Sequence, residues 1–217
     1  MKKTYNDYAG KLILCSSGAF TEHEKTDADN LQNEMLKTCS NDRSVLVVLN
    51  ASDTGSNPLG KAHTAEIFRS LGAKLVDEKS LSTDNFVLLK NYDVIYFMGG
   101  DCAPLIKLAN TNGFKDEIVN CLKLGKIIIG QSAGTLMFQK TLKYYYLAKK
   151  GTKAKYDIPL ETYDGLNMVD ELFYPHFNRL SPEFKAVAEK VEKENGIKFT
   201  KMTDGKFFIY DLKNLKY

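Results

Sequence analysis

Ser132 stands in the pentapeptide Gly-Gln-Ser-Ala-Gly, residues 130–134, directly after the apolar run Ile-Ile-Ile. Gly-x-Ser-x-Gly is the pattern of a nucleophile elbow, in which a serine hydroxyl sits on a sharp turn from a strand into a helix. The turn crowds the backbone on both sides, so the flanking positions must be small. It also aims the first N–H groups of the helix at an incoming carbonyl. Serine is equally a preferred helix N-cap, so the pentapeptide alone leaves a nucleophile and a capping residue as alternatives.

A serine nucleophile needs a base, and the chain has three histidines, His23, His63 and His176. His23 lies in a polar stretch and is expected in a solvated loop. His63 lies near a helix start, where capping or surface placement explains it. His176 follows an apolar stretch that should reach the sheet, within Tyr-Pro-His-Phe. A histidine among aromatic residues is often a core residue, but beside an elbow serine we expect His176 to be the base.

A third, acidic residue should orient the imidazole and stabilise its cation. Asp204 follows His176 in a Thr-Asp-Gly stretch, where an Asp-Gly hairpin turn explains it equally well. Aspartates before His176 would instead give the Ser…Asp…His order of α/β-hydrolases. Glutamates after it fit the solvated face of a helix. Sequence position does not rank the remaining candidates, which are Asp157, Asp164, Asp170, Glu183, Glu189, Glu192 and Glu194.

The stretch Met-Gly-Gly-Asp-Cys, residues 98–102, ends another apolar run. Adjacent glycines let backbone amides approach a ligand closely, so Gly99 and Gly100 are candidates for an oxyanion hole. The alternative is an ordinary glycine turn. Cys102 suggests a rival thiol nucleophile, but no histidine or aspartate partner is indicated for it, so we disfavour it.

Five apolar runs of strand length precede or adjoin these residues, at 11–17, 44–52, 73–81, 92–100 and 126–130. They are apolar on both faces and are separated by helical patterns, which indicates a parallel sheet covered on both sides. The sequence therefore predicts a doubly wound α/β fold, with Ser132 at the carboxyl end of a strand, where ligands bind in such sheets.

The intervening and later segments predict helices and one hairpin in a single domain, residues 1–217. Ser181, Pro182 and Gly196 mark the cap, first position and end of a late helix. Residues 143–162, rich in Lys and Tyr, lack periodicity and are expected to form a surface excursion. The tail after Gly196 predicts a C-terminal hairpin. Further helices are expected at 27–40, from 61 to Gly72, at 103–125 with a break near Asn112-Gly113, and at 132–142.

Composition excludes several classes of function. The net charge of +3 is small and dispersed, so we expect no nucleic-acid partner. No apolar stretch approaches the ~20 residues of a membrane span, and no signal peptide is expected. The cysteines lie far apart without zinc-ligand spacing, which predicts reduced thiols in a cytoplasmic protein. They are Cys15, Cys39, Cys102 and Cys121.

Several segments, in the same order, resemble the serine peptidases typified by peptidase E (aspartyl dipeptidase) and cyanophycinase. The Gly-Gly-Asp motif after a buried strand resembles one hallmark of that family, and Gly-x-Ser-Ala-Gly another. The stretch from Gly-Leu to Pro-His-Phe, within 164–178, resembles the segment that carries its histidine, and 200–211 its C-terminal acidic turn. The similarity spans roughly residues 10 to 210.

The resemblance implies a class I glutamine amidotransferase-like, flavodoxin-like fold and a peptidase of short peptides. It implies Ser132 as nucleophile, His176 as base and Asp204 as the third member. It implies no metal or organic cofactor, and a homodimer is kept as a candidate assembly. Its oxyanion and substrate-binding positions fall on Gly99, Gly100, Asp101 and Ala133.

One departure concerns specificity. Peptidase E recognises an N-terminal aspartate with arginines beyond the histidine, whereas here Arg179 is followed only by lysines such as Lys185, Lys190 and Lys193. Lysine is no equivalent of a bidentate carboxylate clamp, which argues against aspartyl-dipeptide specificity. An esterase or amidase with the same dyad, and a binding protein without catalysis, are the alternative functions.

Overall fold

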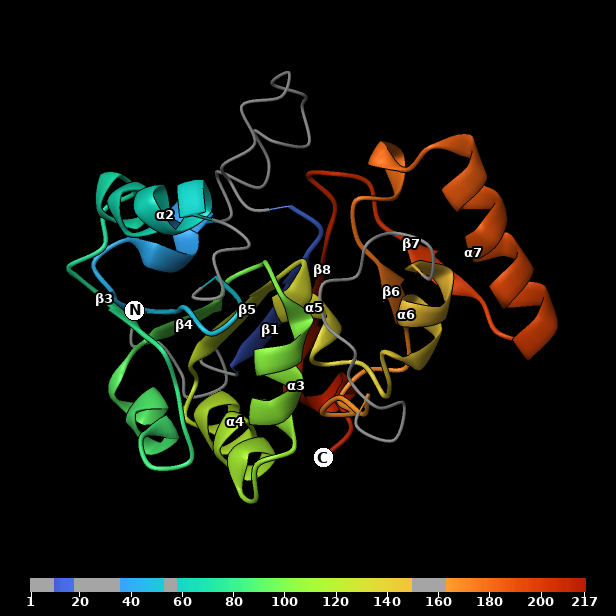
Figure 1. The fold of residues 1–217 in the computed structure, drawn as a ribbon. Helices are drawn as coiled ribbons and strands as arrows, with labels where there is room; N and C mark the ends of the chain where they lie inside the picture. The colour runs from blue at the N-terminus through green and yellow to red at the C-terminus, as the bar shows by residue number, and fades with distance from the viewer. Residues whose placement is uncertain (1–9, 18–35, 53–57, 150–162) are drawn as a thin grey trace.

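The computed structural model describes residues 10–17, 36–52, 58–149 and 163–217, and its fold is drawn in Figure 1. The centre is a six-stranded sheet with the order β3-β2-β4-β5-β1-β8. All neighbours pair in parallel except β8, which runs antiparallel to β1. The strands are β1 (Lys11–Cys15), β2 (Ser44–Val48), β3 (Leu75–Lys79), β4 (Val94–Phe97), β5 (Ile127–Gln131) and β8 (Phe207–Asp211).

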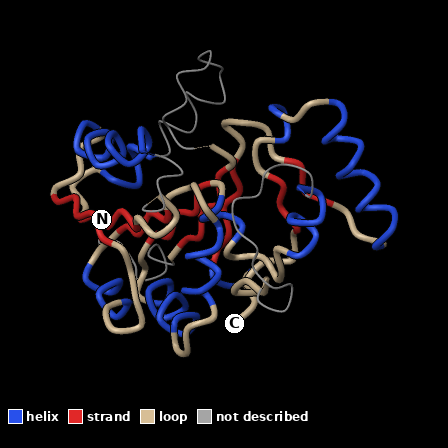
Figure 2. Tube along the Cα trace, in the orientation of Figure 1, coloured by secondary structure: helices blue, strands red, loops and turns tan. Residues whose placement is uncertain are grey.

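Helices cover both faces of this sheet, which confirms the doubly wound α/β prediction (Figures 1 and 2). Phe68 of α2 (Pro58–Ser70) belongs to a buried cluster on one face, together with Val47 and Ile129 of the strands. Leu105 and Ile128 belong to a second cluster, formed against α3 (Cys102–Ala109) and α4 (Phe114–Lys123). Because both faces are buried there, the inner strands β1, β2, β4 and β5 are almost continuously apolar, whereas the edge strand β3 carries Asp77, Glu78 and Lys79.

The strand order places β1 where a flavodoxin-like sheet has its last strand. The flavodoxin-like order is 2-1-3-4-5. Here β2 to β5 fill the first four places of that order, and β1 lies beside β5 in the fifth. The strand that leads to Ser132 is therefore flanked by β4 and β1, and the ends of all three strands meet at one place.

A second, two-stranded parallel sheet lies beside the first, formed by β6 (Leu172–Tyr174) and β7 (Phe199–Lys201). Two helices, α6 (Lys143–Lys149) and α7 (Pro182–Asn195), pack with it (Figure 1). Short 3₁₀ helices lie at 86–91, 177–179 and 212–214. The end of β6 leads directly to His176, so this small sheet positions the predicted base.

The predicted C-terminal hairpin is wrong. A turn does lie at Asp204-Gly205, where Gly205 has a φ of 78°, but the strands on either side of it join different sheets. β7 pairs with β6, and β8 pairs with β1. A tight turn sets the direction of the chain but does not decide which strand the next strand pairs with. In β8, Phe207 and Phe208 pack on opposite faces of the main sheet.

Two further expectations need correction. The helix predicted at 132–142 is only α5 (Ala133–Leu136), because the carbonyls of Met137 and Phe138 accept hydrogen bonds from Leu166 and Met168 at 2.8 and 2.9 Å. The expected surface excursion at 143–162 begins instead with α6, in which Tyr145 and Ala148 are buried. Its remainder, 150–162, lies outside the described residues, as does 27–35 of the predicted helix at 27–40.

The late helix is as predicted. Ser181 caps α7 by accepting a hydrogen bond from the N–H of Phe184, and Gly196 ends it with a φ of 62°. Gly113, with a φ of 80°, separates α3 from α4. Within the ranges that the structure describes, no helix combines the length and apolar character needed to traverse a bilayer.

Candidate active site

Ser132 occupies a strained turn between β5 and α5. Its φ of 50° and ψ of −106° are unusual for a residue with a side chain. The side chain makes no capping hydrogen bond to the helix that it precedes. Its Oγ lies instead 3.0 Å from Nε2 of His176. The capping alternative therefore does not describe this serine, and the geometry is that of a half-buried elbow hydroxyl that faces a histidine.

The two glycines of the pentapeptide are required by contacts across the turn. A Cβ on Gly130 would lie 2.6 Å from the carbonyl oxygen of Gly134, and a Cβ on Gly134 would lie 2.3 Å from that of Phe97. Both distances are well below van der Waals contact. Thr135 supports the same turn, because its Oγ1 lies 2.7 Å from the carbonyl oxygens of both Gly130 and Cys15.

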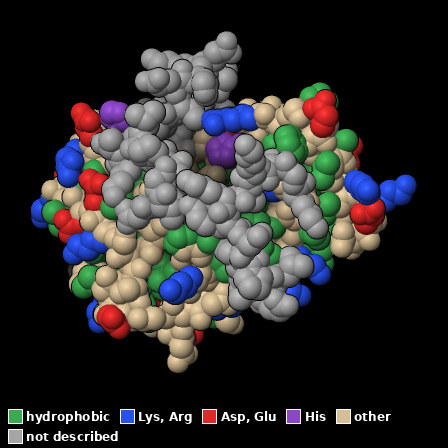
Figure 3. Space-filling view, in the orientation of Figure 1, with side chains coloured by type: hydrophobic (Ala, Val, Ile, Leu, Met, Phe, Trp, Pro, Cys, Tyr) green, Lys and Arg blue, Asp and Glu red, His purple; other side chains and the backbone are tan. Residues whose placement is uncertain are grey.

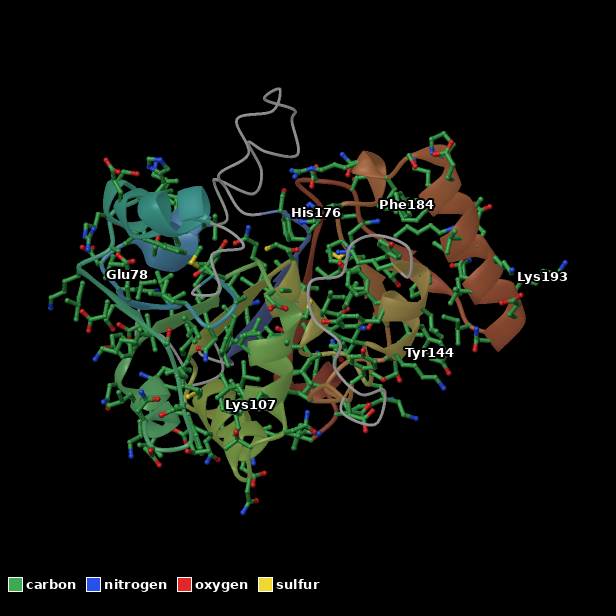
Figure 4. The ribbon with its side chains drawn as sticks, viewed as in Figure 1. Glu78, Lys107, Tyr144, His176, Phe184 and Lys193 are labelled. Atoms are coloured by element: carbon green, nitrogen blue, oxygen red, sulfur yellow. The ribbon has the colours of Figure 1, made fainter. Side chains whose placement is uncertain are left out.

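His176 follows β6 in a left-handed conformation, with a φ of 56°. Its side chain is 29% exposed, and in Figure 4 it lies over the end of the central sheet. The space-filling view shows a histidine on the surface at this position, with cationic side chains beside it (Figure 3). The two ring nitrogens face different partners: Nε2 faces Ser132, and Nδ1 lies 2.6 Å from Oδ1 of Asp204.

Asp204 is held from its other side as well. Oδ2 accepts hydrogen bonds from Nδ2 of Asn178 at 3.1 Å and from Nε of Arg179 at 2.5 Å. The backbone N–H of Asp204 in turn donates to Oδ1 of Asn178 at 3.0 Å. Burial alone would raise the pKa of the Asp204 carboxyl, but the hydrogen bonds from His176, Arg179 and Asn178 outweigh it and lower the pKa to about 2.

The charge of Asp204 determines the tautomer of His176. A carboxylate with a pKa of about 2 is ionised near neutral pH and can only accept hydrogen bonds. Nδ1 of His176 must therefore carry the proton that lies between the two side chains. In the neutral imidazole, Nε2 is then an acceptor, and it faces the hydroxyl of Ser132.

Asn178 and Arg179 were not predicted as partners of the acid. The sequence suggests a role for Arg179 only in substrate recognition, whereas the structure places it on Asp204. Both residues follow His176 closely in sequence, but no pattern there indicates that they turn toward a carboxylate 25 or 26 positions later.

Asp204 is the only acidic residue in the described ranges that contacts His176. Asp164 forms an isolated bridge with Thr141, and Asp170 pairs with Lys216. Glu192 bonds the N–H of Phe199, while Glu183 lies in the exposed first turn of α7. Glu189 and Glu194 pair with lysines, and Asp157 lies outside the described residues.

The other histidines are not part of this arrangement. His63 is exposed and lies 3.8 Å from Glu66, three residues along α2. His23 lies outside the described residues. Cys102 is buried, and burial raises the pKa of its thiol to about 12, so it is not a thiolate at neutral pH.

The glycine pair after β4 lies against the elbow. A Cβ on Gly99 would be 3.1 Å from Cβ of Ser132, so a larger residue would press on the serine. The N–H of Gly99 points to Oε1 of Gln131 at 3.4 Å, and that of Asp101 donates to Ala51 at 2.9 Å.

Two backbone donors near the elbow remain open. No acceptor in the described part of the chain pairs with the N–H of Gly100 or of Ala133. The side chain of Asp101 caps α3 by accepting from Ala103 at 3.0 Å. The same described ranges hold no group of three or more His, Cys, Asp or Glu side chains suited to a metal ion.

The low pKa of Asp204 makes a prediction about stability. Its folded pKa of about 2 lies below the ordinary value of 3.8, so the ionised form stabilises the folded state above about pH 4. This contribution, on the order of 2 kcal/mol, is lost as the pH falls through about 2. We expect Asp204→Asn to lower the free energy of unfolding by that amount at pH 6, and the difference from wild type to close toward pH 2.

Denaturant unfolding at several pH values measures this difference. Asp170→Asn is the matched control, because its carboxylate pairs with Lys216 while 78% exposed and should contribute little at any pH. A gap between wild type and Asp204→Asn that persists unchanged at pH 2 would contradict the assignment.

Comparison with known proteins places the chain among peptidases. The profile of peptidase family S51 matches residues 12–214. An uncharacterized peptidase of Listeria monocytogenes is 30% identical over 67% of this chain, and peptidase E of Escherichia coli is 26% identical over 56%. These matches span 66% and 50% of the two relatives' own lengths.

Solved structures show the same fold. The crystal structure of a peptidase from an acI-B1 Actinobacterium superposes with a TM-score of 0.64 at 21% identity, covering 94% of this chain and 84% of that one. A protein of Listeria monocytogenes EGD-e, solved at 1.5 Å, superposes with a TM-score of 0.68 at 24% identity, covering 95% and 96%.

Proposed function

This chain belongs to peptidase family S51, and from that premise we propose that it is a serine peptidase that hydrolyses short peptides. The observation that carries the proposal is the line of contacts from Ser132 Oγ to His176 Nε2, 3.0 Å, and from His176 Nδ1 to Asp204, 2.6 Å. Ser132 is the nucleophile, His176 the general base and Asp204 the residue that orients the base.

In the first step a proton passes from Ser132 to His176. Nε2 of His176 accepts the hydroxyl proton of Ser132 as Oγ attacks the carbonyl carbon of the peptide bond. The imidazolium that forms is stabilised by the ionised carboxylate of Asp204, which does not itself take up the proton. Arg179 and Asn178 hold that carboxylate in place and keep it charged.

The negative charge that develops on the carbonyl oxygen must be stabilised by hydrogen-bond donors. We assign this role to the backbone N–H groups of Gly100 and Ala133. Ala133 begins α5, where an N–H has no partner within the helix. Gly100 has a φ of 140°, a conformation that residues with a side chain rarely adopt. The amides of Gly99 and Asp101 already have acceptors within the protein.

The second half of the reaction reverses the proton path. The imidazolium donates its proton to the leaving amine, which departs and leaves an acyl group on Ser132 Oγ. His176 then accepts a proton from a water molecule, whose oxygen attacks the acyl carbon. Collapse of that intermediate releases the acid and returns the proton to Ser132.

The contact of Arg179 with Asp204 has a consequence for substrate specificity. It is the only arginine in the sequence after His176, and its guanidinium is bound to Asp204. A clamp for a substrate aspartate from this segment would require a second arginine. We therefore propose a peptidase without preference for an N-terminal aspartate.

A substrate panel tests this function. We expect the protein to hydrolyse dipeptides, with similar kcat/KM for Asp-Leu and Ala-Leu. Fluorophosphonate should label Ser132. Turnover of esters with no hydrolysis of any peptide would favour the esterase alternative. A folded protein that neither labels nor turns over any of these substrates would favour a binding protein.

A further inference from the structure

Three consecutive residues at the end of β1 each contact a different catalytic loop. We call Cys15, Ser16 and Ser17 the β1 brace. All three are buried, with exposed fractions of 1%, 0% and 0%. None of their side chains touches Ser132, His176 or Asp204 through a reacting atom; the contacts are made to the backbones that carry these residues.

Cys15 holds the nucleophile. Its carbonyl oxygen accepts the N–H of Ser132 at 2.9 Å and also lies 2.7 Å from the hydroxyl of Thr135. These contacts involve its backbone, so they do not depend on the thiol. They fix the strained turn that carries Ser132 to the end of the neighbouring strand.

Ser16 holds the base. Its Oγ accepts the backbone N–H of His176 at 2.8 Å and lies 3.3 Å from the carbonyl oxygen of Met202, to which it donates. Met202 belongs to the segment after β7, and its carbonyl also accepts the N–H of Phe177 at 2.9 Å. One buried hydroxyl thus joins the end of β1 to the loop after β6 and the segment after β7.

Ser17 holds the acid. Its Oγ accepts the backbone N–H of Gly205 at 2.9 Å, directly after Asp204. The turn is tied to the brace a second time, because the N–H of Ser16 donates to the carbonyl of Lys206 at 2.9 Å. The position of the Asp204 carboxylate is therefore set from β1 as well as by Asn178 and Arg179.

These contacts matter because the three catalytic groups come from different parts of the fold. Ser132 follows β5 of the central sheet, His176 follows β6 of the small sheet, and Asp204 lies on the connection between the two sheets. We propose that Ser16 and Ser17 are positioning residues that set the distance from His176 to Ser132 and from Asp204 to His176. The inference rests on the proposed function, in which these distances carry the reaction.

Loss of either hydroxyl leaves a backbone N–H without its partner. His176 depends on this contact, because it holds a left-handed conformation that is unfavourable for a side-chain-bearing residue. Without the hydrogen bond from its backbone N–H to Ser16 Oγ, the loop that carries His176 should move from its present position. A displacement of about 1 Å at a catalytic group lowers turnover about 100-fold. We expect Ser16→Ala to lower kcat by about 10- to 100-fold, and Ser17→Ala by about 10-fold, with KM within a factor of about two of wild type.

The experiment compares these variants with Ser40→Ala. Ser40 is also fully buried, and its hydroxyl donates to a backbone carbonyl, that of Leu36, at 2.6 Å. It precedes β2, so it lies at the opposite end of the sheet from the site. Ser40→Ala should leave kcat unchanged. Equal losses of kcat in all three variants, or no loss in Ser16→Ala and Ser17→Ala, would overturn the inference.

A second readout does not depend on turnover. The proton between Nδ1 of His176 and Asp204 should give a far-downfield proton resonance in wild type and in Ser40→Ala, and a weakened or shifted one in Ser16→Ala and Ser17→Ala. An unchanged resonance in both brace variants overturns the inference. If Ser16→Ala does not fold, Ser16→Cys carries the same test, because a thiol is a weaker acceptor of similar size.

Turnover and the downfield proton resonance together distinguish failure of the proposed function from failure of the proposed role of the β1 brace. A wild-type protein that hydrolyses no peptide removes the proposed function, and the resonance then still tests whether the brace sets the contact between His176 and Asp204. If the wild-type protein is active and the brace variants are as active as Ser40→Ala, the positioning role of Ser16 and Ser17 is ruled out while the proposed function stands.

Discussion

Replacing Ser132 with alanine is expected to lower kcat/KM by about six orders of magnitude. The hydroxyl is the only group that we assign to covalent attack, and nothing takes its place when it is removed. The other groups of such a site retain only the residual catalysis that the oxyanion donors and substrate binding supply. Because the side chain makes no capping bond and Ala adds no volume, the fold should be unchanged.

Steady-state hydrolysis of a dipeptide and labelling with a fluorophosphonate measure this effect. Cys102→Ala is the matched control, because it removes the rival nucleophile, a buried thiol whose pKa is raised to about 12. That variant should label and turn over like wild type. Unchanged hydrolysis in Ser132→Ala would remove the serine mechanism, and loss in Cys102→Ala would point to the thiol.

Replacing His176 with asparagine is expected to lower kcat by about five to six orders of magnitude. Asparagine tolerates the left-handed conformation that His176 adopts, so the backbone should keep its course. Its shorter side chain provides no base at the position of Nε2, 3.0 Å from the hydroxyl of Ser132. An unassisted serine is a weak nucleophile near neutral pH.

The residual rate of His176→Asn should rise with pH, because hydroxide replaces the missing base. The control is His63→Asn, since His63 is exposed and interacts only with Glu66 among the described residues. Its kcat should equal that of wild type. Activity of His176→Asn within tenfold of wild type would show that another group accepts the proton.

The fold was predictable where burial determines the sequence. Strands covered on both faces must be apolar throughout, so β1, β2, β4 and β5 appear as apolar runs in the chain. The family match over 12–214 confirms the resemblance. The hairpin and the long helix after Ser132 were wrong because both depend on partners distant in sequence. Met137 ends α5 by bonding Leu166, and β8 joins β1 almost two hundred residues away.

The candidate site was predictable to the extent that its chemistry has a local signature. Ser132 is marked by two glycines that nothing larger can replace, and His176 by the apolar strand before it. Asp204 had no such mark, since an Asp-Gly turn occurs for structural reasons alone. Ser16 and Ser17 were beyond prediction, because they act through backbone N–H groups 160 and 188 positions away, which any residue type provides.

The separation of β7 from β8 has a consequence for how the molecule is made. The segment that carries Asp204 leads into β8, and it is anchored on the central sheet by the pairing of β8 with Lys11–Cys15 and by the contacts of Ser16 and Ser17. A growing chain therefore presents its elbow serine, complete by Gly134, well before the relay behind it exists. A nascent chain that lacks Phe207–Asp211 therefore has the serine but not the assembled acid, and under the proposed function it should not hydrolyse peptides.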